Sequence, residues 1–379
     1  MTIVTRAALA GTVSAVGMGA ASALSASVAP SLFPPPGQAA VFVQTDNPAG
    51  NQIVAYERAP NAVLGDPQAY NTGGDGAVTS GSAVDSLASQ GSLVLANGGR
   101  PLLAVDAGSD TVSVFRVFGS RLVLSQVVAS GREFPASIAV HGDLVYVLNS
   151  GGAGSVQEFS FFGGRLIPLW GSNRSLGLSN MSPPFFLDSP GQVGFTPDGQ
   201  QLIVTTKNSG SDIDVYSVGE FGYLSGQPTA NAAAAPVPFA FTFDAVGNLI
   251  VTEAGSSDLA SYSVASNGTV TKIGSAGDGQ AALCWVTVVD GYFYGSNAGS
   301  ANVSQFGETS DGVPNLVGVA ASLSSGATDS AASSNGRYLY VEEGGIGTVA
   351  EFQVASAGAL AQIGQVSELS APLEGVAAS

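Results

Sequence analysis

Short apolar runs separated by Gly, Asn and Asp recur along the chain, and one motif within them repeats. The motif is an aliphatic residue followed three positions later by an aromatic one. Its seven copies lie at residues 53–56, 112–115, 156–159, 213–216, 259–262, 303–306 and 349–352. The intervals between them average about 49 residues, which is the length of a four-stranded propeller blade.

The neighbours of each copy predict the other strands of the unit. A β-branched or aromatic run such as Leu144-Val145-Tyr146-Val147 precedes the motif, and short runs of this composition favour strand over helix. A tight turn such as Pro197-Asp198-Gly199 comes before that run, because Gly, Asn and Asp accept positive φ at little cost. With one more apolar stretch on each side, the unit is four antiparallel strands, which we name a, b, c and d.

The two ends of the repeat predict a closed ring. Six a–b turns accompany the seven motifs, because the chain enters the first unit at strand b, over residues 40–44. Residues 372–377 have the placement of a strand a and supply the missing one. We therefore expect an all-β, seven-bladed β-propeller of four-stranded antiparallel blades over residues 41–379, in which the C-terminal strand completes the N-terminal blade. Such closure removes free sheet edges.

The first 40 residues predict export. Residues 1–29 carry one positive charge, Arg6, and then a run rich in Ala, Gly and Ser with small-x-small sites, as in a cleaved secretion signal. An uncleaved membrane anchor is the alternative, since about 20 apolar residues can span a bilayer. Residues 30–40 form a Pro-rich spacer around Pro34-Pro35-Pro36-Gly37, which is stiff. We expect a secreted, extracellular protein.

Charge and composition narrow the possible partners. The net charge is −17, with 28 acidic and 11 basic residues, which argues against binding nucleic acid or anionic lipid. A single Cys excludes an intramolecular disulfide and a multi-Cys zinc site, and a single His excludes a His-rich metal site. We expect no cofactor, no metal, no membrane contact after signal cleavage, and a monomer.

Some stretches resemble a known family. They are Phe195-Thr196-Pro197-Asp198-Gly199, the run 106–115, and Gly131-Arg132-Glu133-Phe134-Pro135. On these the chain resembles the lactonase-like seven-bladed propellers, which include 6-phosphogluconolactonases and 3-carboxymuconate cyclases, and it is most similar to their secreted branch. The resemblance implies a small sugar or muconate-type lactone bound in the central channel. Enzymatic branches place His and Arg on the active face, whereas here the only His, His141, lies in an a–b turn on the opposite face.

The start of each b–c loop supplies a set of candidate ligand-binding side chains, which we call the ring residues. In a propeller these loops share one face, the top face, with the d–a loops. The ring residues are Asp46, Asp106, Asn149, Lys207, Glu253, Asn297 and Glu343. They could hydrogen-bond a sugar, a lactone or a cation. Alternatively, they cap loops locally, as Asp and Asn often do.

Catalytic candidates lie in the d–a loop before the third blade. Arg132 could hold a substrate carboxylate through two hydrogen bonds, and Glu133 could act as general base. The alternative is a solvated ion pair of about 0–1 kcal/mol. Ser137 and Glu374 are expected near the channel. Cys284, in an inner strand, is expected to be a buried inert thiol.

Two long insertions on the top face, residues 66–90 and 170–188, are candidates for function because long loops without structure often carry it. Tyr70, Trp170, Phe185 and Phe186 could form an aromatic lid over the channel, or simply pack on its rim. Two functional hypotheses follow. One is a secreted lactone-active protein with its site in the top-face channel. The other is a non-catalytic extracellular propeller that binds a glycan, a cation or a wall component.

Overall fold

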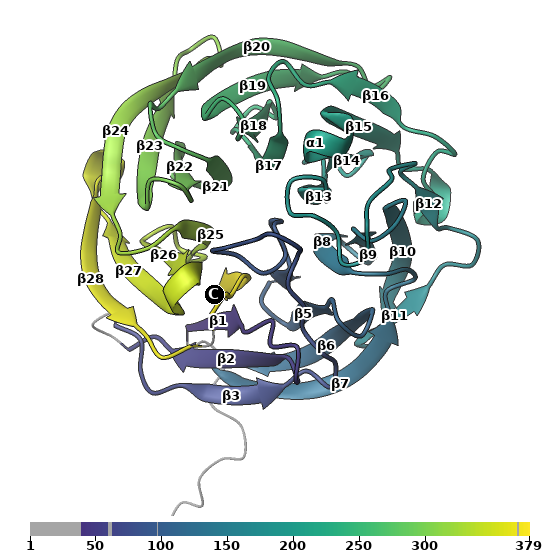
Figure 1. Cartoon of the computed structure of the whole chain (residues 1–379), viewed down its shortest axis with the longest axis horizontal. Helices are drawn as coiled ribbons and strands as arrows, with labels where there is room; N and C mark the ends of the chain where they lie inside the picture. Colours follow the sequence, from purple (N-terminus) through teal and green to yellow (C-terminus); the bar gives the residue numbers. More distant parts are fainter. Residues whose placement is uncertain (1–38, 60–62, 97, 370) are drawn as a thin grey trace, which may run out of the picture. The chain divides into compact units, whose positions relative to one another are not determined.

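The computed structural model describes residues 39–59, 63–96, 98–369 and 371–379. These residues form seven antiparallel β-sheets arranged as blades around a ring (Figure 1). Strand a of each blade is nearest the centre and strand d is at the outside. The predicted seven-bladed propeller is therefore confirmed. The predicted secretion signal and nearly all of the spacer lie outside the described residues.

The strands of the first four blades run from the centre outward in the order a to d. The blade 1 strands are β29 (Val376–Ala378), β1 (Ala40–Gln44), β2 (Gln52–Glu57) and β3 (Gln68–Asn71), and the blade 2 strands are β4 (Leu93–Leu95), β5 (Pro101–Asp106), β6 (Thr111–Phe118) and β7 (Arg121–Ala129). The blade 3 strands are β8 (Pro135–His141), β9 (Leu144–Asn149), β10 (Ser155–Phe162) and β11 (Arg165–Pro168), with a short extra strand β12 (Arg174–Ser175) on β10. The blade 4 strands are β13 (Gln192–Phe195), β14 (Gln201–Thr205), β15 (Asp212–Ser217) and β16 (Thr229–Ala232).

The last three blades follow the same order. The blade 5 strands are β17 (Pro238–Phe243), β18 (Leu249–Glu253), β19 (Asp258–Val264) and β20 (Val270–Gly277). The blade 6 strands are β21 (Leu283–Val289), β22 (Tyr292–Asn297), β23 (Asn302–Glu308) and β24 (Pro314–Ser322). The blade 7 strands are β25 (Ala327–Ala332), β26 (Tyr338–Glu343), β27 (Thr348–Val354) and β28 (Leu360–Val366). The helical turns are α1 (Lys207–Gly210), η1 (Glu220–Gly222), η2 (Gly344–Ile346) and η3 (Ser356–Gly358), and no helix in the described parts of the chain has the length and apolarity to cross a membrane.

The ring closes through the C-terminal strand, as predicted. β29 pairs with β1 in the register Val41↔Ala378, Phe42↔Ala377 and Val43↔Val376. The strand begins at Val376, later than the predicted residue 372. The preceding residues bond elsewhere, since the Glu374 N–H donates to the Asp46 carboxylate at 3.0 Å and the Gly375 N–H to the Glu342 carboxylate at 3.1 Å.

The repeated aromatic of strand c explains why the blades stack. All seven motif aromatics are at most 3% exposed, and each lies in a cluster shared by neighbouring sheets. Tyr216 of β15, for example, packs with Leu202 of its own blade and with Leu148 and Val156 of blade 3. Burying such large side chains between sheets provides most of the driving force for the fold.

Polar contacts also join a blade to the c–d turn of the next one, at a boundary that we call a seam. The Tyr146 hydroxyl donates to the Gly222 carbonyl across the seam of blades 3 and 4, and the Tyr294 hydroxyl donates to the Gly358 carbonyl across the seam of blades 6 and 7. The Glu158 carboxylate accepts the Leu224 N–H at 2.8 Å. These contacts fix the spacing of the turns on the face opposite the top face, which we call the bottom face.

Candidate functional site

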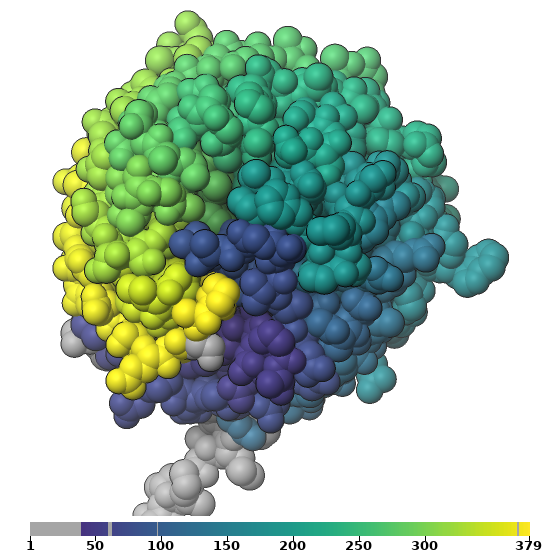
Figure 2. Space-filling view, in the orientation of Figure 1, coloured from purple at the N-terminus to yellow at the C-terminus, as the bar shows by residue number. Residues whose placement is uncertain are grey.

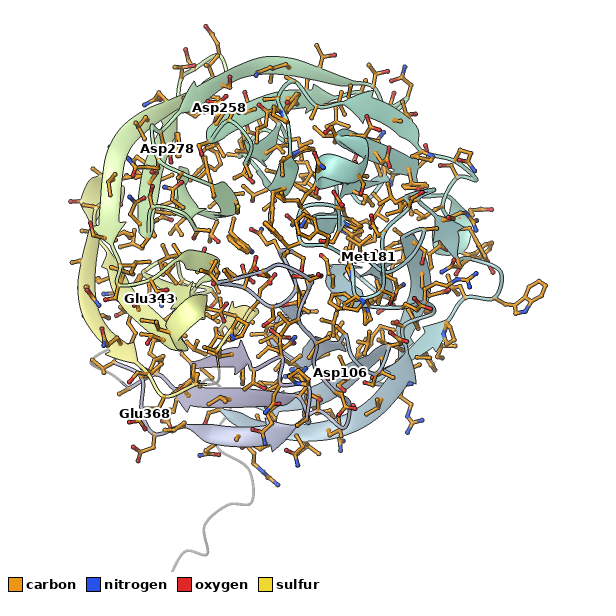
Figure 3. All side chains as sticks on the ribbon, in the orientation of Figure 1. Asp106, Met181, Asp258, Asp278, Glu343 and Glu368 are labelled. Carbon is orange, nitrogen blue, oxygen red and sulfur yellow. The ribbon has the colours of Figure 1, made fainter. Side chains whose placement is uncertain are left out.

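The ring residues lie where the sequence placed them, at the b–c end of each blade, but they are buried. Each is between 0% and 3% exposed. Asp106 and Glu343 are labelled in Figure 3 in different sectors of the ring. The seven side chains are therefore spread around the ring within their own blades.

Most of the ring residues make hydrogen bonds to nearby loops, which explains why polar side chains are buried there. The Asp106 carboxylate accepts the Ser113 hydroxyl at 2.6 Å and the Asn51 amide at 3.0 Å. The Glu343 carboxylate accepts the N–H groups of two consecutive residues, Ser324 and Ser325, in the d–a loop that joins blade 6 to its own blade. Such bonds satisfy loop N–H groups locally. A role for these residues in ligand binding stays a prediction, and only Asp46 and Lys207 lie at the centre.

Lys207 is one of the two ring residues at the centre. Its ammonium group donates to the Ala88 carbonyl at 2.6 Å, to the Phe186 carbonyl at 2.5 Å and to the Ser189 hydroxyl at 2.9 Å. The same nitrogen lies 4.7 Å from the centre of the Phe239 ring. The Lys207 side chain is fully buried, and this burial lowers its pKa to about 8.

One partner of Lys207, the Ala88 carbonyl, belongs to the first insertion, and the last part of this insertion crosses the centre of the ring (Figure 1). We call residues 85–90 the plug. Figure 2 shows the dark blue atoms of this insertion across the centre of the top face. The Trp285 indole N–H donates to the Ser89 carbonyl at 2.6 Å, and the Ser137 hydroxyl donates to the Gln90 carbonyl at 2.6 Å. The plug is thus bonded to several blades at once, and Ser137 lies at the channel as predicted.

Glu374 holds the plug from the opposite side. One of its carboxylate oxygens accepts the N–H groups of Leu87 at 2.7 Å and Ala88 at 2.8 Å, and the other accepts the Ser89 N–H at 2.8 Å. Glu374 is fully buried. Three consecutive backbone donors on one carboxylate form an anion-binding arrangement of the kind that peptide N–H groups make elsewhere.

Four further carboxyl groups surround Glu374, and together we call the five the acid cluster. Its members are Asp46, Asp85, Asp329, Glu342 and Glu374, all at most 5% exposed. Burial raises the pKa of Asp46 to about 8, and burial followed by repulsion from neighbouring carboxylates raises the pKa values of Glu342 and Glu374. Asp46 therefore keeps its proton at neutral pH, and burial shifts the pKa values of Glu342 and Glu374 in the same direction. Within the described ranges, no group of His, Cys, Asp or Glu has the arrangement of a metal site.

Arg132 and Glu133 lie apart from the contacts that hold the plug. Both are exposed on the d–a loop between β7 and β8. The Ser130 hydroxyl donates to the Arg132 carbonyl at 2.8 Å, and the Gly151 N–H donates to the Glu133 carbonyl at 3.1 Å. Lys272 and Glu253 form the one salt bridge recorded among the described residues, so Arg132 and Glu133 are not paired with each other there. Their catalytic role stays a prediction.

The two insertions meet on the top face. The Ser80 N–H donates to the Pro184 carbonyl at 2.8 Å, and the Phe186 N–H donates back to the Ser80 carbonyl at 3.0 Å. Phe185 and Phe186 pack edge to face at 4.8 Å. Tyr70 lies instead in the outer strand β3, and Trp170 is 93% exposed. Of the four aromatics considered for a lid, Phe185 and Phe186 are next to the plug.

Sequence reasoning missed Asp85, Asp329 and Glu342. Glu342 follows the apolar run Tyr338-Leu339-Tyr340-Val341, and a carboxyl that continues a buried strand is a usable signal. Asp85 belongs to an insertion without a repeat, so no pattern assigned it a place. Cys284 is buried beside this cluster, and burial raises the pKa of its thiol to about 12, which agrees with an inert thiol.

Comparison with known proteins gives matches in structure. No protein-family model and no curated protein matches the sequence. The periplasmic gluconolactonase of Pseudomonas aeruginosa is 16% identical, with a TM-score of 0.69 over 90% of this chain and 99% of that one. A protein of Lactobacillus plantarum is 18% identical, with a TM-score of 0.69 over the same shares. A candidate 6-phosphogluconolactonase of Bacteroides uniformis is 16% identical, with a TM-score of 0.67 over 90% and 99%. The chain therefore has the fold of the 6-phosphogluconolactonase-like seven-bladed propellers.

Proposed function

We propose that the protein is an exported lactonase-like propeller that binds a small neutral lactone or sugar at the top-face centre, between Lys207 and Glu374, and that the plug occupies this place in the closed state. The observation that carries the proposal is the pair of contacts made by the plug backbone. Lys207 donates a hydrogen bond to the Ala88 carbonyl, while the Glu374 carboxylate accepts hydrogen bonds from consecutive backbone N–H groups. A hydroxylated lactone offers the same two features, a carbonyl acceptor and several hydroxyl donors.

The charges of the site favour a neutral ligand. Lys207 is the one cation beside the five carboxyl groups around the plug, so a phosphorylated or multiply charged anion finds little compensating positive charge there. Carboxyl groups that retain their protons can instead donate to ring and hydroxyl oxygens, as neutral carboxylic acids do in other binding sites. The other ring residue at the centre, Asp46, belongs to this cluster, and burial raises its pKa to about 8.

The test measures ligand binding and turnover by residues 30–379, the protein expected after signal cleavage. We expect the neutral glucono-δ-lactone to raise the melting temperature, and the phosphorylated form of this lactone not to do so. Trp285→Phe removes the indole donor from Ser89, so it loosens the plug and should strengthen binding. Lys207→Met should abolish binding.

The outcomes separate the two functional hypotheses. Hydrolysis of the bound lactone supports an enzyme, and loss of this hydrolysis in Arg132→Ala or Glu133→Gln would assign those residues a catalytic role. Binding without turnover supports a non-catalytic propeller. If neither the native chain nor Trp285→Phe binds any member of the panel, the proposed site at the plug is wrong.

Export is proposed on the N-terminal pattern of Arg6 followed by a run of small apolar residues. The matched periplasmic gluconolactonase is a protein of an exported compartment by its name, which supports the proposal without testing it. Expression of residues 1–379, followed by N-terminal sequencing of the protein from the medium or periplasm, tests it. A new N-terminus near residue 30 is expected, and an intact Met1 in the membrane fraction would favour the anchor.

A further inference from the structure

A cavity opens on the bottom face at the seam of blades 3 and 4, away from the plug. Its volume is about 820 Å³, within the roughly 300–1,000 Å³ typical of small-ligand sites. The β13–β14 turn and the β15–β16 turn line it, together with four residues of blade 3: His141 at the end of β8, Leu144, Ser160 and Leu169. The top-face site does not include any of these residues.

The polar wall of this cavity is the β13–β14 turn, and hydrogen bonds within this turn hold the Asp198 side chain in place. The Asp198 carboxylate accepts the Thr196 hydroxyl at 2.7 Å and the Gln200 N–H at 3.1 Å. These two bonds, with a smaller contribution from His141, lower the pKa of Asp198. His141 lies directly on Gly199, where an added Cβ would approach its ring to 2.4 Å. The wall therefore presents a fixed acceptor beside an imidazole.

An exposed aromatic stands at the edge of the same cavity. Phe221 is 80% exposed and has a left-handed backbone with φ of 61°, a conformation that is uncommon for a bulky residue. Blade 7 makes the same turn over η3, where the corresponding residue is Ala357 with φ of 59°. The turn thus needs no aromatic residue, and the Phe221 side chain has no folding role that the turn explains.

A second side chain also differs between this seam and the seam of blades 6 and 7. Leu144 and Tyr292 are the first residues of their b strands, and both lie against the glycine of the next c–d turn, Gly222 or Gly358. The backbone is held alike at both seams, by the Tyr146 and Tyr294 hydroxyls. The cavity therefore has a leucine where the other seam has a larger tyrosine.

We propose that this cavity binds a neutral oligosaccharide. The Phe221 ring offers an exposed face for the C–H side of a sugar ring, since aromatic faces carry partial negative charge. Asp198, Gln200 and His141 face the sugar hydroxyls. Among the described lining residues none is Lys or Arg, while Asp198 and Glu220 are acidic, so an anionic glycan is disfavoured.

Calorimetric titration of residues 30–379 tests this site. The probes are the neutral hexasaccharides of cellulose, chitin and starch, with hexagalacturonate as an anionic contrast and spermidine as a cationic one. We expect one neutral probe to bind with a dissociation constant of about 1 mM or tighter. Phe221→Ala should weaken it about tenfold or more, and Leu144→Tyr should abolish it by filling the cavity. Phe162→Ala, at an exposed aromatic outside the cavity, is the matched control and should bind as the native chain does.

Each of the two cavity variants introduces the residue that the seam of blades 6 and 7 has at the equivalent position, Ala357 or Tyr292. Unchanged melting temperatures are therefore expected. Absence of binding to all neutral probes overturns the proposal, as does binding that both cavity variants leave unchanged. Preference for spermidine would assign the cavity to cations and would also overturn it. None of these outcomes depends on the plug, so this site and the top-face site can fail separately.

Discussion

The top-face channel and the bottom-face cavity use polar side chains in opposite ways. In the channel, Lys207 and Glu374 are fully buried, Glu374 accepts hydrogen bonds from the plug, and Lys207 donates to the plug and to the second insertion. In the cavity, Asp198 and Phe221 are exposed, and no fold contact explains the aromatic ring. The difference teaches that a buried, pKa-shifted cluster can hold the protein's own chain, while exposed groups at a seam remain free for a ligand. Stability and binding should therefore respond to different residues.

The largest effect on the free energy of unfolding is expected from Lys207→Met. It leaves the Ala88 and Phe186 carbonyls without their donor and removes the one lysine beside the acid cluster. Breaking a buried charged contact of this kind costs about 3–5 kcal/mol, measured as the free energy of unfolding in urea. Arg132→Met, at an exposed cation, should change it by less than about 0.5 kcal/mol. Equal effects of the two substitutions would mean that the channel contacts add no stability.

The second effect is a loss of stability as pH rises. A buried Asp46 keeps its proton up to a pKa of about 8, whereas an unfolded carboxyl loses it near pH 4. Between these values the folded state binds more protons than the unfolded state, so the free energy of unfolding falls with rising pH. Lys207, with a lowered pKa of about 8, acts in the opposite direction only above that pH.

Melting temperatures measured from pH 4 to pH 8 test this dependence. They should decrease through the range, and Asp46→Asn should flatten part of the slope. A melting temperature that increases steadily toward pH 8 would contradict the burial of protonated carboxyls in the acid cluster.

A smaller effect is expected from the tyrosines that hold the two seams. Tyr294→Phe leaves the Gly358 carbonyl without its donor and should cost about 1–2 kcal/mol, and Tyr146→Phe should cost a similar amount through Gly222. Only Tyr146→Phe should also weaken oligosaccharide binding, because Gly222 lines the cavity. Chemical denaturation and calorimetry on both variants separate the two roles. Binding lost in both, or in neither, would mean that the seam does not shape the site.

The smallest effect on stability is expected from Phe221→Ala, within about 0.5 kcal/mol, although it removes the aromatic face of the cavity. The ring is 80% exposed and contributes little burial. A stability loss of several kcal/mol, measured by urea unfolding, would mean that Phe221 is part of the fold instead.

The repeat in the sequence made the ring predictable, and the same repeat explains what was missed. The motif aromatics and the Gly-containing turns recur once per blade, so they determine the number of blades, the closure by the C-terminal strand and the b–c end of each blade. They also placed Lys207 on the top face. The plug has no counterpart in other blades, so the pattern did not predict that Asp85 and Ser89 would fill the channel. The seam cavity is lined by turns of two blades, and the difference between Leu144 and Tyr292 becomes informative only once the structure shows that both lie against the glycine of the next c–d turn.

Closure by β29 has a consequence for synthesis. The Ala40 N–H donates to the Ser379 hydroxyl at 2.8 Å, across 339 positions of sequence. During translation, which proceeds at about 5–20 residues per second, blade 1 lacks its innermost strand until residues 376–378 have left the ribosome. The free edge of β1 is meanwhile open to other chains. A late ribosomal stall or a short C-terminal deletion should therefore cause aggregation rather than a soluble six-bladed intermediate.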